Sequence, residues 1–273
     1  MNTTLPGVLA ILSYIAAAAL TLHSMQHAYK ATSSPERGRW QTLGLAWLAI
    51  ILHGSLLIDM TRPLDGLDFS FVNALTLVSW AIAVLLVLTA FFKPVDKLGI
   101  VVYPVSALII LVKIVAPAGV HILQRQGWPM TLHILSSMLA YSLLNIAALQ
   151  ALLLALQDWG LRTHHANSLL VRSLPPLQTM ENLLFQLLGS GFGLLTLSLG
   201  TGFIFLDNLF AQHLAHKTVL SILAWLVFAM VLAGRIRYGW RGQVAIRWTL
   251  GGFVSLMLAY FGSKMVMEWI LKR

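Results

Sequence analysis

Long apolar runs separated by short polar segments make up most of the chain. Each run is about 17 residues or longer, which is enough for an α-helix to cross the hydrocarbon core of a bilayer. Strands of a membrane β-barrel would be shorter and would alternate apolar with polar positions. Because backbone polar groups inside lipid must bond within their own segment, the runs are predicted to be helices. The eight predicted spans cover residues 5–27, 42–58, 71–92, 98–116, 131–156, 184–205, 217–234 and 244–270.

Composition narrows the class of protein further. Of the 273 residues, 58% are hydrophobic and only 10% are charged, whereas an average soluble domain carries about 25% charged residues. A soluble enzyme or a nucleic-acid-binding module is therefore excluded. We predict an all-α, polytopic integral membrane helical bundle, with residues 1–273 forming a single transmembrane domain. No charged residue precedes the run from Leu5 to Leu22, so we expect a retained first helix rather than a cleaved signal peptide.

The basic residues are unevenly divided between the two sets of loops. Eleven of the 18 Lys and Arg residues lie in the first set: Lys30, Arg37, Arg39, Lys93, Lys97, Arg162, Arg172, Arg235, Arg237, Arg241 and Arg247. The positive-inside rule assigns these loops to the cytoplasm, which predicts that both termini are periplasmic. This distribution also accounts for the net charge of +9, so no nucleic-acid partner is expected.

Several kinds of chemistry are excluded by what the sequence lacks. Without cysteine there is no disulfide, thiolate metal site or covalent c-type haem attachment. No P-loop, GxSxG or HExxH motif occurs, and no predicted span carries Asp or Glu near its middle. Proton-driven carriers normally have such an acid. We therefore expect neither an enzyme nor a proton-coupled carrier, although a small-molecule facilitator stays open.

Three of the nine histidines are candidate ligands, because three different spans place them near the outer side. His53 shares a helical face with the small residues Ala46 and Ala49, so this face should point into the bundle. His133 opens the fifth predicted span, and His216 immediately precedes the seventh. Neutral imidazole binds metals and haem iron well. The alternative is that each is an interfacial histidine satisfied by a carbonyl or by water. The other six are expected in loops or at the inner membrane interface: His23, His27, His121, His164, His165 and His213.

Glycine and aromatic residues of the later spans allow two interpretations. Gly189 and Gly193 form a GxxxG pattern, which favours close packing of helices. The same glycines would let a flat ligand approach the backbone. Tyr141 and Trp225 are among the aromatic residues placed to line such a ligand, although aromatic residues in membrane bundles mostly serve packing.

The order of residues in the second half of the chain is specific. The segments that carry it are His216-Lys-Thr-Val-Leu-Ser-Ile-Leu-Ala-Trp225, Gly234-Arg-Ile-Arg-Tyr-Gly-Trp-Arg-Gly242, Gly251-Gly-Phe253, Leu132-His-Ile-Leu-Ser-Ser-Met-Leu-Ala-Tyr141 and Leu174-Pro-Pro-Leu-Gln-Thr-Met-Glu-Asn-Leu-Leu-Phe185. This order resembles the cytochrome c assembly family, the haem-handling membrane proteins of the CcsA, ResC and CcmC kind. It is most similar to the smaller YpjD/HemX branch.

The resemblance implies a non-covalent b-type haem held near the outer leaflet of the bacterial inner membrane. His133 matches the outer-side histidine of the family, and His53 looks like its transmembrane histidine. His216 stands where larger members end their tryptophan-rich segment. The candidate axial ligands, and the only metal ligands expected, are thus His53, His133 and His216, two at a time. Tyr141 and Trp225 are expected to contact the same cofactor. Two imidazoles would give low-spin, six-coordinate iron.

The sequence departs from larger members in two places. Residues 207–217 lack the tryptophan-rich, Asp-terminated motif, and Ala233-Gly234 replaces a further histidine. The resemblance therefore implies haem binding, transfer or regulation rather than ligation to an apocytochrome. Expected partners are haem, membrane lipids and other proteins of cytochrome c biogenesis or the haem pathway. The alternative is a membrane regulatory or scaffold subunit without cofactor, for example in haem biosynthesis or in a membrane complex.

Overall fold

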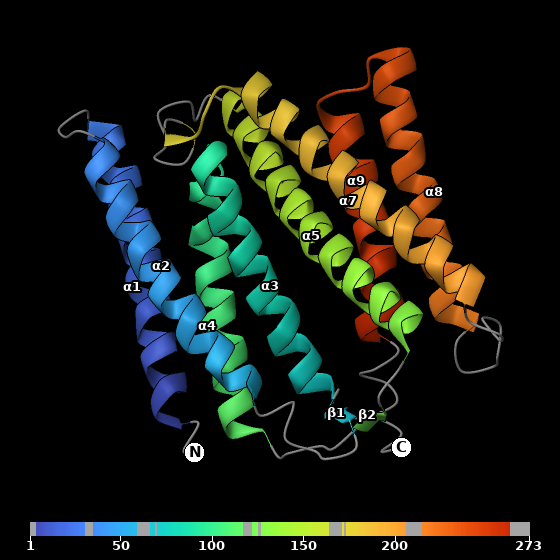
Figure 1. The fold of residues 1–273 in the computed structure, drawn as a ribbon. Helices are drawn as coiled ribbons and strands as arrows, with labels where there is room; N and C mark the ends of the chain where they lie inside the picture. The colour runs from blue at the N-terminus through green and yellow to red at the C-terminus, as the bar shows by residue number, and fades with distance from the viewer. Residues whose placement is uncertain are drawn as a thin grey trace. The chain divides into compact units, whose positions relative to one another are not determined.

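The described part of the chain is almost entirely helical (Figure 1). The computed structural model describes residues 4–30, 35–58, 66–68, 70–116, 122–124, 127–163, 171, 173–205 and 215–262. They belong to two compact units, one of Met1–Arg125 with Trp159–Pro176 and one of Gln126–Asp158 with Leu177–Arg273. The predicted class, an all-helical membrane bundle, is confirmed. That the whole chain acts as a single domain stays a prediction.

The first unit is built from four helices. They are α1 Thr4–Lys30, α2 Pro35–Leu57, α3 Phe71–Phe92 and α4 Gly99–Val115, with the 3-10 turn η2 Asp96–Leu98 before α4. α1 packs against α2 and α4, and α3 packs against α4 and α2. Two short strands, β1 Gly66–Asp68 and β2 Ile122–Gln124, pair antiparallel with Gly66 opposite Gln124. Large buried side chains such as Tyr14, Tyr103 and Leu86 fill the interior of this unit.

The second unit contains the remaining long helices. They are α5 Trp128–Arg162, whose end from Trp159 onward belongs to the first unit, α7 Leu177–Phe205, α8 Ala215–Tyr238 and α9 Gln243–Met257, followed by the π-helix η3 Leu258–Gly262. α8 packs against α7 and α9. These helices begin earlier or end later than the apolar runs predict, because polar residues at the membrane interface continue the same helix. α7, for example, begins directly after Pro175-Pro176, where proline can no longer interrupt it.

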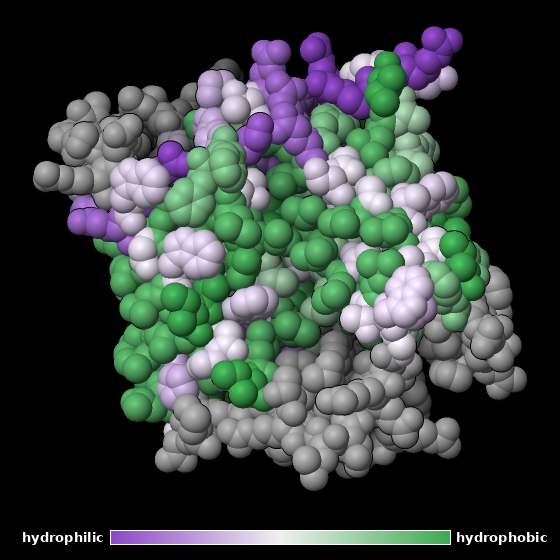
Figure 2. Space-filling model, in the orientation of Figure 1, coloured by the Kyte–Doolittle hydropathy of each residue, from purple (hydrophilic) through white to green (hydrophobic). Residues whose placement is uncertain are grey.

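Within the part of the chain that the structure describes, seven helices are long and apolar enough to cross a membrane. Their surfaces carry many exposed apolar side chains. On the face seen in Figure 2, hydrophobic residues cover the middle and hydrophilic ones gather toward the top. Helix α9 has 15 residues and continues directly into η3 Leu258–Gly262, and it is not among these seven. The end of the predicted eighth span lies outside the described residues. The eighth crossing therefore stays a prediction.

Helix α7 makes its close approach to α5 through Gly191, not through the GxxxG pair. A Cβ on Gly191 would lie 2.8 Å from Cγ of the buried Leu144 and 3.3 Å from its backbone nitrogen. At Gly189 and Gly193, no atom of the described chain lies within 4 Å of an added Cβ. The predicted helix packing at Gly189 and Gly193 is therefore wrong for the described residues. The reason is rotational, because the face buried near Gly191 continues through Leu195 and Ser198.

The turn between α8 and α9 is held by contacts to α8 and to α7. Gly239 and Gly242 adopt φ angles of 66° and 59°, a region that favours glycine over residues with a side chain. The Trp240 ring lies where a Cβ on Gly234 would stand. The backbone N–H of Gly242 donates to Oε1 of Glu181, a buried acid in the first turns of α7. These contacts tie the start of α7 to the start of α9.

We expect Glu181→Ala to lower the thermal stability of the protein. The variant leaves the Gly242 amide without its acceptor, which costs about 1–3 kcal/mol for a buried group. Glu181→Gln keeps an acceptor oxygen and should lose less. Asn182→Ala is the control, because Asn182 is exposed and accepts only a long hydrogen bond of 3.4 Å from Arg235. Thermal unfolding in detergent, followed by tryptophan fluorescence, measures the effect. A Glu181→Ala protein as stable as wild type would contradict this role.

Candidate functional site

His133 lies in the second turn of α5, and one nitrogen of its ring is held by a hydrogen bond. Its Nδ1 is 2.9 Å from the backbone oxygen of Ser198 on α7. A carbonyl oxygen can only accept, so Nδ1 carries the proton and the neutral ring keeps its lone pair on Nε2. Histidines that bind metals are commonly held in this way, with the second ring N–H donated to a carbonyl. The half-buried ring of His133 thus has the tautomer that a haem ligand needs.

Trp225 of α8 is held against the same helix α7. Its Nε1 donates to Oγ1 of Thr196 at 2.8 Å. Its ring stacks on Phe192 with 5.5 Å between centroids and 26° between planes. The indole is therefore oriented by one hydrogen bond and one aromatic contact. Its predicted contact with a flat cofactor stays a prediction.

Tyr141 lies deeper in α5 and is buried. Its hydroxyl donates to Sδ of Met257. Phe253 and Tyr260 flank the ring, with centroid distances of 6.3 Å and 5.9 Å. These contacts join α5 to α9 and to the π-helix that follows, so packing accounts for the aromatic ring. The predicted cofactor contact of Tyr141 also stays a prediction.

His216 is the second residue of α8, in the same unit as His133. Its side chain is exposed and makes no hydrogen bond to any residue that the structure describes. No contact joins the His133 and His216 rings within that part of the chain. Both imidazoles are thus accessible to an added ligand, and their sharing of one stays a prediction.

His53 lies in the other unit and is completely buried in α2. Ala46 and Ala49 on its helical face are buried as well, which confirms that this face points into the bundle. The Tyr14 hydroxyl is 3.2 Å from Nδ1 of His53, and the two rings meet edge to face at 5.8 Å. Tyr14 in turn stacks on Tyr103 at 6.0 Å. An aromatic pair therefore holds the imidazole from one side.

The other nitrogen of the His53 ring, Nε2, is buried without a hydrogen-bond partner among the described residues. The backbone of Thr76 also acts electrostatically on the ring. A buried polar atom left without a partner costs about 1–3 kcal/mol. When Nδ1–H donates to the Tyr14 oxygen, Nε2 keeps its lone pair, and a bound metal ion or hydrogen-bond donor would remove that cost. His53 therefore has a reason to bind a ligand.

Two further polar side chains of this unit extend the environment of His53. Lys113, in the last turn of α4, donates to Oδ1 of Asn73 on α3. The Lys113 ammonium is close enough to act electrostatically on the His53 ring. Charged groups inside membrane helices are rare and mostly functional. No sequence pattern predicts the pairing of Lys113 with Asn73, because Lys113 is near a helix end, where lysine ordinarily extends to the interface.

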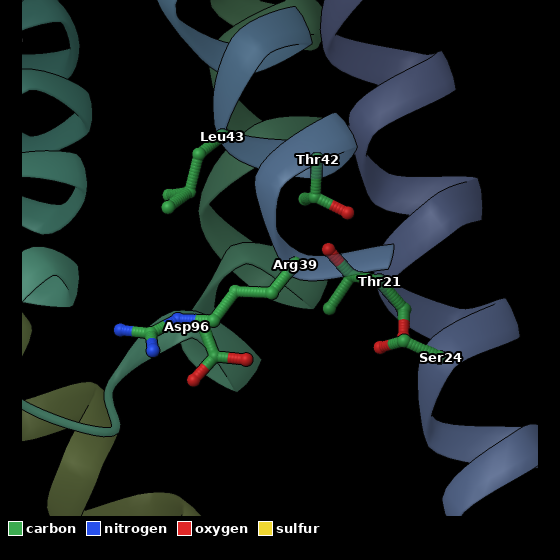
Figure 3. A pocket seen from close by; sticks show the side chains of 6 residues that line it. All are labelled: Thr21, Ser24, Arg39, Thr42, Leu43 and Asp96. Atoms are coloured by element: carbon green, nitrogen blue, oxygen red, sulfur yellow. The ribbon is translucent and has the colours of Figure 1, made fainter. Parts of the chain in front are cut away.

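The same unit also contains a small pocket, and no histidine lines it. Figure 3 shows its lining side chains, which come from α1, α2 and η2: Thr21, Ser24, Arg39, Thr42, Leu43 and Asp96. About 10 Å³ is open to the centre of a water molecule, which is room for roughly one water. The hydroxyls of Thr21 and Thr42 donate to their own helices. The pocket is too small for a cofactor.

The described residues contain no group of three or more His, Asp or Glu side chains able to hold a metal ion. Of the remaining histidines, His23 lies exposed in α1. His121, His164, His165 and His213 lie outside the described residues, and the side chain of His27 does as well. Tyr14 and Ser198, which hold the two buried or half-buried candidate rings, were not foreseen from sequence. A tyrosine in an apolar run and a backbone carbonyl carry no distinctive signal.

Comparison with known proteins identifies the family of the chain. Residues 41–271 match the family model described as Cytochrome C assembly protein. Inner membrane protein YpjD of Escherichia coli (strain K12) is 32% identical over 240 residues, covering 86% of this chain and 90% of that protein. Cytochrome c biogenesis protein CcsA of Gloeobacter violaceus is 31% identical over 84 residues, covering 30% of this chain and 25% of that protein. No solved structure matches the chain significantly.

The family match begins in α2, so it reaches beyond the second half of the chain, where the specific order of residues occurs. Seven apolar helices and the similarity to an inner membrane protein agree with the predicted localisation. The chain is a multi-pass inner membrane protein. It belongs to the cytochrome c assembly protein family and is similar to inner membrane protein YpjD.

Proposed function

We propose that the protein binds b-type haem non-covalently, with Nε2 of His133 as one axial ligand. The observation that carries this proposal is the hydrogen bond from His133 Nδ1 to the Ser198 carbonyl, which leaves the lone pair on Nε2. The hydrogen bond also restrains the His133 ring, so the ring loses little conformational entropy when it binds a ligand. The names of the family and of the relative CcsA, which refer to cytochrome c assembly and biogenesis, support a haem-related role.

A second axial ligand comes from His53 or His216. His53 supports this role by its buried, unpartnered Nε2, and His216 by its exposed ring in the unit that also holds His133. Bound haem would supply an iron centre with two imidazole ligands and low-spin character. The residues of this chain would hold the iron, fix the ring tautomer and limit water at the half-buried His133. We propose handling of haem, with other haem-pathway proteins as partners, rather than catalysis.

The proposed topology has eight crossings, with both termini in the periplasm. Its support is the position of basic residues at the ends of the described helices. Lys93 follows α3, Lys97 lies in η2, and Arg235 and Arg237 lie in the last turn of α8. In this topology those ends face the cytoplasm, as the positive-inside rule requires. His133 and His216, at the beginnings of α5 and α8, then lie on the periplasmic side.

The first test is an absorption spectrum of the protein purified in mild detergent, oxidised and then reduced with dithionite, with haem quantified per chain. We expect a low-spin b-type spectrum with close to one haem per chain, present on purification or after addition of hemin. Hemin added to detergent alone is the control for free haem. A colourless protein that takes up no hemin would overturn the proposal. The family membership would then fit a regulatory or scaffold subunit without cofactor.

A further inference from the structure

We propose that the turn between α8 and α9 is a binding surface for the headgroups of anionic phospholipids. Arg237, Arg241 and Arg247 are exposed on this turn and the adjoining helix ends. None of them makes a hydrogen bond or an ion pair to any residue in the described ranges. Arg235 differs, because its guanidinium donates to the Trp240 carbonyl at 3.3 Å and lies 4.6 Å above the Phe185 ring. One arginine thus stabilises the turn, and three remain available.

The backbone that carries these arginines is fixed in position. Gly239 and Gly242 set the course of the turn through their positive φ angles. The Trp240 ring packs on Gly234, and Glu181 accepts the Gly242 amide. The turn joins α8 directly to α9 (Figure 1). Because its backbone is held at these points, it carries the arginines on a restrained segment. A preorganised surface loses less conformational entropy when it binds.

Apolar side chains next to the arginines favour lipid as the partner. Ile236 is 87% exposed and Tyr238 is 76% exposed at the end of α8, and Trp248 is exposed in α9. Tyrosine and tryptophan concentrate at the headgroup level of membranes, where one end of the side chain is apolar and the other is wet. The planar guanidinium binds phosphate through two parallel hydrogen bonds. Cations and apolar groups on one surface at the end of a membrane helix fit a phospholipid better than a water-soluble protein.

Native mass spectrometry of the detergent-purified protein, titrated with phosphatidylglycerol or phosphatidylcholine, tests the proposal. We expect the wild type to retain phosphatidylglycerol in preference to phosphatidylcholine. The double variant Arg237→Gln/Arg241→Gln should bind phosphatidylglycerol about tenfold more weakly, since each basic residue at a membrane surface contributes a several-fold gain. The replaced side chains are exposed and make no hydrogen bond or ion pair to a described residue, so the thermal stability of the variant should equal that of wild type.

The matched control is Lys93→Gln/Arg162→Gln, which removes two exposed cations outside the turn. It should bind phosphatidylglycerol as wild type does. Equal binding of the two lipids by the wild type would overturn the proposal. So would an equal loss in the control, or full binding by the Arg237→Gln/Arg241→Gln protein, which would leave the surface to a protein partner. None of these measurements depends on haem, so the proposed function and this surface stand or fall separately.

Discussion

Replacing His133 with alanine is expected to remove most of the bound haem. The ring is the one candidate ligand whose tautomer is set by a hydrogen bond to a carbonyl, from Nδ1 to Ser198. Loss of an outer hydrogen bond to a metal ligand already costs about 10–100-fold in metal affinity, and loss of the ligand itself should cost at least as much. Haem per chain should therefore fall at least about tenfold after purification, and any haem retained should lose the low-spin, six-coordinate spectrum.

Two companion variants separate loss of the ligand from loss of the fold. His23→Ala replaces an exposed histidine of α1 that is not a candidate ligand, and it should leave haem content and spectrum unchanged. His133→Gly leaves space beside Ser198, so added imidazole should restore the low-spin spectrum if the cavity holds it in the original place. Thermal unfolding of each apoprotein shows whether the bundle is intact. A His133→Ala protein with the haem content and spectrum of wild type would rule out His133 as an axial ligand.

The second ligand is identified by the same spectroscopy. His53→Ala and His216→Ala are expected to differ, because only the true partner of His133 contributes to six-coordination. A ligand role for His53 also makes Tyr14 important, since its hydroxyl contacts Nδ1 of the buried ring. The variant that loses the six-coordinate spectrum therefore identifies the second ligand.

The sequence predicted those parts of the fold that depend on local composition. The predicted span 71–92 coincides with α3, because the polar residues Ser70 and Lys93 bound a largely apolar run that contains no charged residue. The start of α7 was placed at residue 184 but lies at Leu177. Its first turns are amphipathic and contain the buried Glu181, so an apolar count misses them. The pattern of apolar residues thus predicts where the helices lie, but it predicts their polar ends less accurately.

For the candidate site, too, the sequence predicts some features and not others. Residue type and expected depth were enough to select His53 and His133, and the first is buried as its small-residue face predicted. The groups that hold these rings, Tyr14 and the Ser198 carbonyl, depend on which helices meet and at what rotation. That information is tertiary, and no local pattern in the sequence contains it. For the same reason the GxxxG pattern pointed to the wrong face of α7.

We expect Gly191→Val to destabilise the protein strongly and Gly193→Val to leave it nearly unchanged. Inside a membrane, helices associate through close van der Waals contact rather than through the hydrophobic effect. A Cβ on Gly191 would stand 2.8 Å from Cγ of Leu144, which is well inside contact distance. Leu144 is 1% exposed and has little space to move into. Overpacking of this kind costs about 1–3 kcal/mol.

The two variants make the same chemical change two positions apart on one helix. The gain in helix propensity when glycine becomes valine is therefore common to both, and the difference between them reports packing alone. At Gly193 an added Cβ meets no atom of the described chain within 4 Å. Thermal unfolding in detergent should give a melting temperature several degrees lower for Gly191→Val than for Gly193→Val. An equal decrease would mean that Gly193 also packs tightly, and the GxxxG pair would then be an interface after all.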